Sequence, residues 1–323
     1  MNILRMTALV LAIGVAAVAQ AQEKTKTFAE RLGWGPNDKV VIFHTDDVGM
    51  SRSSNLGAIE SLENGLSKSM SIMMPCPWVP GIAEYLKTNP TVDAGLHLTL
   101  TSEWKSYRWG PLVGKPAAPG LCDQQGCMWS NVVQVVNNAS PDEVEAEIRA
   151  QIERAEQLGI PITHIDSHMG TLFATKEFFE RYLKVGIEKN LPILIAGGHL
   201  HFASIENPGA VKLLGGVVEM AWDAGLPVLD DIHTASYGWK REEKVEKYCQ
   251  LMRELKPGIT EVIHHASKPT EDFPFITDSS PSRDGDLIAM TSPELKKVVE
   301  EEGIIITTWR ELKERRDKVG ATK

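Results

Sequence analysis

The chain has 323 residues, of which 42% are apolar and 24% are charged, and its formal net charge is −9. This apolar content is too high for a disordered protein, and an acidic chain without a basic cluster is not typical of a nucleic-acid-binding protein. After the N-terminal stretch, no apolar run approaches the roughly 20 residues needed to span a bilayer. We therefore expect an acidic globular protein with no nucleic-acid partner, and no membrane association once the N-terminal stretch is removed.

The N-terminus has the pattern of a secretory signal peptide, which we assign to residues 1–21. Arg5 supplies the positive start, an apolar run extends from Met6 to about Val18, and Ala19-Gln20-Ala21 is a small-x-small cleavage site. The pattern predicts an exported chain, either periplasmic or secreted, that is cut after Ala21. An uncleaved membrane anchor is the alternative.

Short runs rich in β-branched residues alternate with longer amphipathic stretches along the rest of the chain. The predicted strands are 40–45, 69–74, 94–100, 162–166, 192–196, 227–230, 261–265 and 304–308. The predicted helices are 54–64, 80–88, 141–158, 176–189, 208–224, 241–255 and 293–302. Such alternation is typical of a parallel sheet covered by helices, and seven or eight units favour a TIM-barrel-like (β/α) barrel, closed or incompletely closed, over an open sheet. We therefore expect residues 22–323 to form a single domain.

The segment from about 101 to 139 interrupts this alternation, and we predict a long loop that acts as a lid or as part of a functional site. It contains Trp104, Trp109 and Trp129, which either stack against a substrate or only fix the loop to the barrel. It also contains Cys122 and Cys127 around a short polar turn. In an exported protein this pair favours a local disulfide, with half of a zinc site as the alternative, and we expect no catalytic cysteine.

Acidic residues and histidines stand at the ends of four predicted strands. They are Asp46-Asp47 after the first strand, His97 in the third, His164, Asp166 and His168 at the fourth, and His264-His265 at a late strand. In a (β/α) barrel the C-terminal ends of the strands meet at one mouth, where catalytic residues lie. We therefore expect these side chains to converge.

Two adjacent carboxylates at a buried strand end are unfavourable because each raises the pKa of the other, and a divalent cation would remove that cost. One carboxylate with two imidazoles is a common open hydrolytic metal site, in which a second carboxylate can act as general base. Each motif alone has a simpler explanation: the acid pair as a helix cap or surface turn, and a single histidine as a hydrogen-bonded core residue. Their joint occurrence at successive strand ends favours a metal site.

Several segments of the chain match one known set of family motifs. His44–Ser51 reads His-Thr-Asp-Asp-Val-Gly-Met-Ser, where the family usually has Ala-Asp-Asp-Phe-Gly-Leu-Ser after the first position. Further similar segments are Gly65–Ser71, Gly95–Thr101, the Gly110–Trp129 loop and Thr163–His168. Together, over about Val40 to Leu312, these segments resemble the YdjC/ChbG-type carbohydrate deacetylases.

The resemblance implies a TIM-barrel-like fold and metal-dependent hydrolysis of an amide bond. The implied substrate is an N-acetylated sugar or oligosaccharide, as in chitooligosaccharide deacetylation. Asp47, His97 and His168 match the metal ligands of the family and are implied to hold one divalent ion, Zn²⁺ or Mg²⁺. His164 or Asp166 would orient these ligands through hydrogen bonds.

The resemblance also implies roles in proton transfer. Asp46 would be the general base that takes a proton from water, and His265 would be the general acid that protonates the departing sugar amine. The family often has Cys-His-Pro where this chain has His264-His265-Ala266, so His264 stays an alternative to His265. Arg283 lies in a stretch that we predict to be a polar connection, where it either contacts substrate or forms a surface salt bridge.

Two other functions stay open from the residues alone. One is hydrolysis of a different ester or phosphoester bond at the same metal site, although the strand ends carry none of the cationic groups that phosphoryl transfer favours. The other is a non-catalytic carbohydrate-binding barrel, although every position of the catalytic pattern is filled. The sequence does not fix the oligomeric state, and a homodimer is one alternative.

Overall fold

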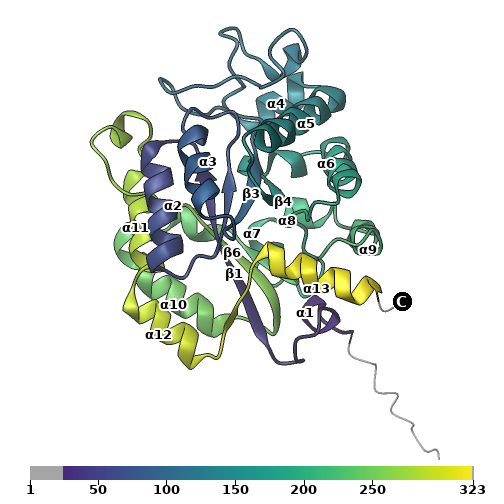
Figure 1. Cartoon of the computed structure of the whole chain (residues 1–323), viewed down its shortest axis with the longest axis vertical. Helices are drawn as coiled ribbons and strands as arrows, with labels where there is room; N and C mark the ends of the chain where they lie inside the picture. Colours follow the sequence, from purple (N-terminus) through teal and green to yellow (C-terminus); the bar gives the residue numbers. More distant parts are fainter. Residues whose placement is uncertain (1–24, 322–323) are drawn as a thin grey trace, which may run out of the picture.

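The protein is built around one curled sheet of parallel strands, in which β1 lies between β2 and β6 (Figure 1). The computed structural model describes residues 25–321, so the predicted signal peptide at 1–21 lies outside the described residues. The strands are β1 (Lys39–Val48), β2 (Ser69–Ile72), β3 (Asp93–Leu98), β4 (Ile162–Ser167), β5 (Asp231–His233), β6 (Gly258–His264) and β7 (Ile305–Ile306). Their order across the sheet is β4-β3-β2-β1-β6-β5, and β7 pairs with the beginning of β1. The predicted TIM-barrel-like fold with incomplete closure is confirmed.

The strand ladder is interrupted between β4 and β5. Segments 192–196 and 227–230, which the sequence predicts as strands, form only isolated bridges among the described residues. Each segment begins with a proline, Pro192 or Pro227, which has no backbone N–H to donate to a ladder. The regular strand β5 begins only at Asp231. Isolated bridges therefore stand here in place of the full strands of a TIM barrel.

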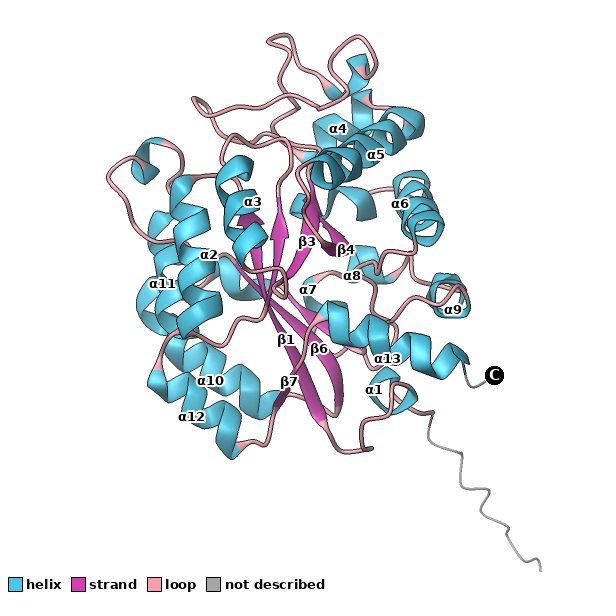
Figure 2. Ribbon diagram, in the orientation of Figure 1, coloured by secondary structure: helices cyan, strands magenta, loops and turns pink. Residues whose placement is uncertain are grey.

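Helices surround the sheet (Figure 2). They are α1 (Phe28–Arg31), α2 (Arg52–Asn64), α3 (Val79–Thr88), α4 (Val132–Asn138), α5 (Pro141–Gln157), α6 (Lys176–Lys189), α7 (Ala203–Glu206), α8 (Pro208–Val211), α9 (Val217–Asp223), α10 (Lys244–Glu254), α11 (Ser280–Met290), α12 (Pro293–Glu301) and α13 (Trp309–Ala321). Within residues 25–321, no helix combines the length and the apolar character that crossing a membrane would require.

The helix predicted over 208–224 is wrong, because the structure has two helices there, α8 and α9. The break includes Gly216, whose φ of +77° does not fit a continuing helix.

The predicted polar connection around Arg283 is also wrong, since this residue lies on the buried face of α11. The sequence pattern also misses α13, whereas α2, α3, α5, α6, α10 and α12 agree with the predicted helices to within a few residues.

Strand β1 has an apolar first half, Val40–Phe43, and is covered on both faces. All but its first residue are buried, as expected for a central parallel strand. Val41 and Phe43 pack in a cluster with residues of α10 and α12, whereas Val40 and Ile42 pack in a separate cluster. The side chains of β1 therefore alternate between two packed layers, which holds the strand firmly up to its functional end.

The predicted long loop at about 101–139 connects β3 to α5 and contains the short helix α4. Trp109 is buried, and its Nε1 donates a hydrogen bond to the carbonyl of Thr101 at 2.9 Å. Nε1 of Trp129 donates to the carbonyl of Gly120 at 2.7 Å. These two indoles therefore hold the loop in its fold.

The predicted disulfide between Cys122 and Cys127 is wrong, because both cysteines are free thiols in the structure. Hydrogen bonds close the turn between them instead. The Asp123 carboxylate accepts from the backbone N–H groups of Gln125 and Cys127, at 2.8 and 3.1 Å. The backbone N–H of Asp123 donates to the carbonyl of Cys127 at 2.7 Å.

Helix α2 approaches the segment after β6 at a glycine. A Cβ atom at Gly57 would lie 2.3 Å from Cα of Ser267 and 2.5 Å from the carbonyl oxygen of Ala266. Both are backbone atoms, which cannot rotate out of the way as a side chain can. Because Ala266 directly follows His265, the missing side chain of Gly57 allows the close packing that positions a predicted catalytic residue.

We expect Gly57→Ala to lower the free energy of unfolding by about 1–3 kcal/mol, because the added methyl group is forced against backbone. Gly238→Ala is the matched control, since no heavy atom outside its immediate neighbours lies within 4 Å of its Cβ position. That change should leave stability unchanged or raise it by about 0.4–1 kcal/mol. Chemical denaturation of both variants measures the difference, and equal stabilities would show that the packing of α2 does not need the glycine.

Candidate active site

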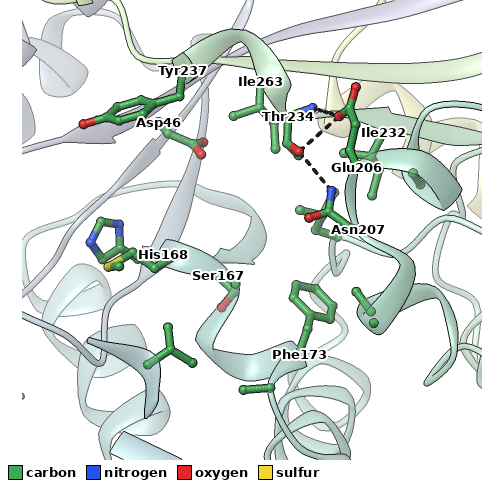
Figure 3. Close-up of a pocket in the computed structure, with 18 of the residues that line it drawn as sticks. Asp46, Ser167, His168, Phe173, Glu206, Asn207, Ile232, Thr234, Tyr237 and Ile263 are labelled. Atoms are coloured by element: carbon green, nitrogen blue, oxygen red, sulfur yellow. Dashed lines mark hydrogen bonds between the residues drawn. The ribbon is translucent and has the colours of Figure 1, made fainter. Parts of the chain in front are cut away.

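One cavity of about 860 Å³ lies at the C-terminal ends of the parallel strands. Strand β1 contributes Asp46 and Asp47, β3 contributes His97, and the chain continues from β4 into His168. His265, the residue after β6, lines the same cavity. In Figure 3, Asp46 and His168 lie on the same side of the open space. Carboxylates and imidazoles from four strand ends thus come together at one mouth of the barrel.

A strained turn at the end of β1 directs the two carboxylates. Asp47 has a φ of +61°, in the left-handed region that few residues other than glycine adopt. Gly49 has a φ of +84°, and its backbone N–H donates to Oδ1 of Asn55 at 2.7 Å. Such conformations persist where the surrounding structure holds them, and they occur often at functional sites. Here the turn allows the consecutive side chains of Asp46 and Asp47 both to reach the cavity.

Asp47, His97 and His168 form a buried group around one oxygen atom. Oδ1 of Asp47 lies 3.4 Å from Nε2 of His97 and 3.2 Å from Nδ1 of His168. This oxygen has no well-formed hydrogen bond to any described residue. A buried carboxylate oxygen is unfavourable unless a hydrogen-bond donor or a cation satisfies it. One carboxylate oxygen and two imidazole nitrogens at this spacing therefore fit a divalent metal ion.

The other ring nitrogen of each of these histidines is held by a carboxylate. Nδ1 of His97 lies 2.5 Å from Oδ1 of Asp166, and Nε2 of His168 lies 3.1 Å from Oε1 of Glu103. Such hydrogen bonds fix the tautomer and the ring plane of a metal-binding histidine. The sequence analysis named Asp166 for this role and missed Glu103, which lies in the irregular loop with no recognisable motif around it.

His44 lies behind the cavity and links Asp46 to Asp166. Its Nε2 lies 3.1 Å from Oδ1 of Asp46 and 3.1 Å from Oδ2 of Asp166, and its Nδ1 lies 3.4 Å from Oε1 of Glu261. Although burial lowers the pKa of His44, these carboxylates together raise it well above 6.5. The ring is therefore cationic and neutralises part of the buried negative charge. The sequence analysis missed this residue because it precedes the acid pair inside an apolar strand.

The two adjacent histidines at the end of β6 have different surroundings. His265 lines the cavity, and its Nε2 lies 3.9 Å from Oδ2 of Asp46. His264 is fully buried, and its Nε2 lies 2.7 Å from Oγ of Ser67 and 3.1 Å from Oγ1 of Thr45. Burial lowers the pKa of both rings, so both are mainly neutral at pH 7. Of these two residues, it is His265 that lies where a molecule in the cavity would contact it.

Comparison with known proteins agrees with this arrangement. The model of one protein family, described as YdjC-like protein, matches residues 40–301. The chain belongs to the YdjC-like family. The resemblance inferred from the sequence motifs is therefore confirmed.

Relatives of this YdjC-like chain match most of its length. A carbohydrate deacetylase of Thermus thermophilus is 31% identical over 286 residues, which are 88% of this chain and 97% of that protein. A carbohydrate deacetylase of Thermoanaerobacter pseudethanolicus is 24% identical over 275 residues, which are 85% of this chain and 100% of that protein. Among solved structures, a candidate cellobiose-phosphate cleavage protein of Enterococcus faecalis has a TM-score of 0.74 at 22% identity and covers 85% of this chain and 99% of that one. This last similarity supports the fold.

In this YdjC-like chain Arg283 is a buried partner of Asp47, so the predicted surface salt bridge is wrong. Nη2 of Arg283 lies 2.6 Å from Oδ2 of Asp47, and the guanidinium lies 5.3 Å from the ring centroid of Tyr237. Although burial opposes ionisation, Arg283 and the neighbouring histidines hold the pKa of Asp47 well below 3.8. Arg283 also lines the cavity, and its Nη1 has no hydrogen-bond partner among the described residues.

The three tryptophans proposed as substrate contacts occupy different places. Trp104 lines the cavity. Trp109 and Trp129 are absent from the described lining, and both indoles hold the loop through the hydrogen bonds given above. The structure therefore places one of the three where a substrate in the cavity would contact it.

His164 supports the barrel interior more directly than it supports the candidate metal ligands. Its ring stacks on Trp309 with centroids 5.3 Å apart, and the edge of its ring meets His44 at 5.0 Å. Burial lowers the pKa of His164 to about 4, so the ring is neutral at pH 7. Among the described contacts, its hydrogen bond goes to the hydroxyl of Thr163 at 2.9 Å. Among the described ring contacts of His164, the one toward the site is with His44.

A buried ion pair anchors the backbone at His265. Asp286 of α11 accepts a hydrogen bond from the N–H of His265 at 3.1 Å and one from the hydroxyl of Tyr248 at 2.8 Å. Oδ1 of Asp286 lies 2.6 Å from Nζ of Lys244 on α10, and both side chains are fully buried. A buried carboxylate that loses its cation is strongly destabilising. Lys244 therefore supports the segment that carries His265.

We expect Lys244→Met to lower the free energy of unfolding by about 3–5 kcal/mol, because it leaves the charge of Asp286 buried without its ammonium partner. Lys247→Met on the same helix is the matched control, since its ion pair with Glu243 is exposed to solvent and such pairs contribute little to stability. Urea denaturation of the unchanged chain and both variants measures the effect. A loss in Lys244→Met no larger than that in Lys247→Met would contradict the anchoring role.

Proposed function

We propose that this chain is a metal-dependent carbohydrate deacetylase, which hydrolyses the amide bond of N-acetylated amino sugars such as those of chitooligosaccharides and releases acetate. The observation that carries the proposal is the convergence of Asp46, Asp47, His97, His168 and His265 on one cavity. Membership in the YdjC-like family and similarity to proteins named carbohydrate deacetylases support it.

Asp47, His97 and His168 would hold the metal, through ligand atoms that all lie within 4.8 Å of one another. The unpaired, buried Oδ1 of Asp47 supports this fit, because a cation would give that oxygen its missing partner. A divalent ion, zinc or magnesium, supplies Lewis acidity toward the amide carbonyl and lowers the pKa of water when it is bound. One carboxylate with two histidines suits zinc, whereas magnesium prefers oxygen ligands.

Asp46 is the proposed general base, and it takes the proton of the attacking water on Oδ2. This oxygen lies 3.7 Å from Nε2 of His97 and 3.9 Å from Nε2 of His265. The other oxygen, Oδ1, is held by the hydroxyl of Ser71 at 3.2 Å and by the ring of His44. A carboxylate fixed on one side keeps its free oxygen directed at the reacting water, which general base catalysis requires.

His265 is the proposed general acid, which donates a proton to the departing amine. Its Nδ1 has no hydrogen-bond partner among the described residues, and the edge of its ring meets Tyr237 with centroids 4.8 Å apart. Burial lowers the pKa of His265, so the ring takes up a proton before it acts, and its protonated form then gives up that proton more readily than a free histidine does. Arg283 lines the cavity, and its positive charge would stabilise the negative charge that develops on the carbonyl oxygen.

Purified protein supplied with zinc or magnesium is expected to release acetate from N,N′-diacetylchitobiose, and complete removal of the metal by a chelator is expected to abolish this release. A coupled acetate assay measures the rate, and elemental analysis of the same preparation reports the metal content. Acetate release that survives complete metal removal would reject the metal dependence. Tight binding of the sugar without acetate release would favour a non-catalytic carbohydrate-binding barrel instead.

Asp46→Asn is expected to lower kcat by at least about 100-fold with unchanged metal content, because it removes the proposed base and leaves the ligands in place. His97→Ala is expected to lower metal content and turnover together. Elemental analysis and acetate assays of the two variants separate these roles. A fully loaded and fully active His97→Ala protein would exclude His97 as a ligand.

We also propose that the chain is exported and acts in the periplasm or outside the cell. The support is the charged, apolar and small-residue pattern of residues 1–21. We also propose that residues 22–323 form a single domain, and the family match at residues 40–301 lies inside it. An exported deacetylase would meet its carbohydrate outside the cytoplasm.

A further inference from the structure

The cavity continues beyond the carboxylates and imidazoles into a region with aliphatic walls. We call this region the apolar chamber and define it by six lining residues, Phe173, Leu194, Leu200, Ala210, Val211 and Leu214. They come from the segment after β4, from the irregular segment 192–196, and from the region of α7 and α8. In Figure 3, Phe173 and Ile232 lie across the open space from Asp46 and His168. The apolar chamber therefore faces the candidate catalytic residues within one continuous cavity.

The polar side chains at the chamber end are already paired with one another. Oε2 of Glu206 accepts hydrogen bonds from the backbone N–H and the hydroxyl of Thr234, at 2.6 and 3.1 Å. The amide of Asn207 donates to the same hydroxyl at 2.9 Å (Figure 3). Oε1 of Glu206 lies 3.4 Å from Nε2 of His233. A ligand group entering this end would meet mostly aliphatic contacts among the described residues.

An unsubstituted oligosaccharide is a poor match for such walls. Each hydroxyl of a sugar needs a new hydrogen-bond partner when it leaves water, and a hydroxyl without one weakens binding. A methylene chain has no such requirement, and each buried methylene tightens binding by about fourfold. The polar groups of a sugar find partners at the other end of the cavity, where Glu103 and Arg283 line it together with Trp104.

We propose that the substrate is an amino sugar that carries an apolar chain, and that this chain occupies the apolar chamber while the amide bond lies among the carboxylates and imidazoles. The inference rests on the proposed function and narrows its substrate class. The same chemistry could come from two sources, a long acyl group on the sugar amine or an apolar aglycone on the sugar. The volume of about 860 Å³ exceeds what an acetyl group needs and is in the range of pockets that enclose drug-sized ligands.

The test compares one reference substrate with two extended ones. The reference is methyl N-acetyl-β-glucosaminide, the first extended substrate carries octanoyl in place of acetyl, and the second carries octyl in place of methyl. We expect kcat/KM for amine release to be at least about tenfold higher for one extended substrate than for the reference, and the preferred one identifies the source of the chain. Calorimetry should show that octyl β-glucosaminide binds at least about tenfold more tightly than methyl β-glucosaminide, with a negative change in heat capacity.

Ala210→Phe tests whether this preference arises in the chamber, because a phenyl ring on α8 would occupy its space. We expect it to lower the ratio of kcat/KM between the preferred extended substrate and the reference by at least about tenfold. Ala224→Phe is the matched control, since Ala224 is an exposed alanine after α9 and is not in the cavity lining. It should leave the ratio unchanged. Because the ratio is taken within one variant, loss of folded protein does not alter it.

Each outcome decides one of the two proposals. Equal kcat/KM for the three substrates, or a preference that both variants retain, would overturn the chamber proposal and leave the deacetylase proposal standing. Absence of amine release from every substrate by the metal-loaded protein would reject the deacetylase proposal. In that case the calorimetry alone decides on the chamber: tighter binding of the octyl glycoside supports it, and equal binding of the two glycosides overturns it.

Discussion

The structure depends on the neutralisation of several negative charges buried at one mouth of the barrel. Asp46, Asp47 and Asp166 are all buried there. Arg283 is paired with Asp47, and His44 lies between the other two carboxylates. Although burial raises the pKa of a carboxyl group, Arg283 and the neighbouring histidines lower the pKa of Asp47, and His97 and His44 lower the pKa of Asp166. Oδ1 of Asp47 has no hydrogen-bond partner among the residues that the structure describes, and it is the atom around which the candidate metal ligands gather.

The groups that balance this charge come from elements far apart in the chain. His44 precedes the acids on β1, whereas Arg283 belongs to α11, where Asp286 also holds the backbone of His265. Lys244 of α10 in turn neutralises Asp286. Helices α10 and α11 therefore do more than cover the sheet, since their buried faces carry the charges that the mouth of the barrel requires. Stability and site geometry are consequently coupled, because a helix that moved away would leave unpaired charges in the core.

The sequence predicted the barrel and the candidate ligand set because both depend on local signals at strand ends, which the parallel topology then brings together. The supporting residues were harder to find. Glu103 lies in an irregular loop, and Arg283 and Asp286 lie on a helix whose buried face is partly charged, so no apolar stripe marks it. Trp109 and Trp129 were visible as aromatic residues, but whether an indole N–H bonds to a loop carbonyl or faces a ligand is decided by tertiary packing. The composition and the spacing of residues therefore do not predict the direction in which such an indole points.

The side of the barrel where the strand ladder fails is also the side where the apolar chamber lies. Segment 192–196 makes an isolated bridge to β4 in place of a full strand, and both Leu194 and Ala196 line the cavity. A regular strand followed by a long helix would close this side, because its helix packs directly against the sheet. Here α7 and α8 have only four residues each. They line the cavity without filling it. The mouth of the barrel therefore has two sides, one formed by regular strands and one formed by the segments with isolated bridges. The regular strands fix the acids and imidazoles, and the irregular side leaves room for the rest of a substrate.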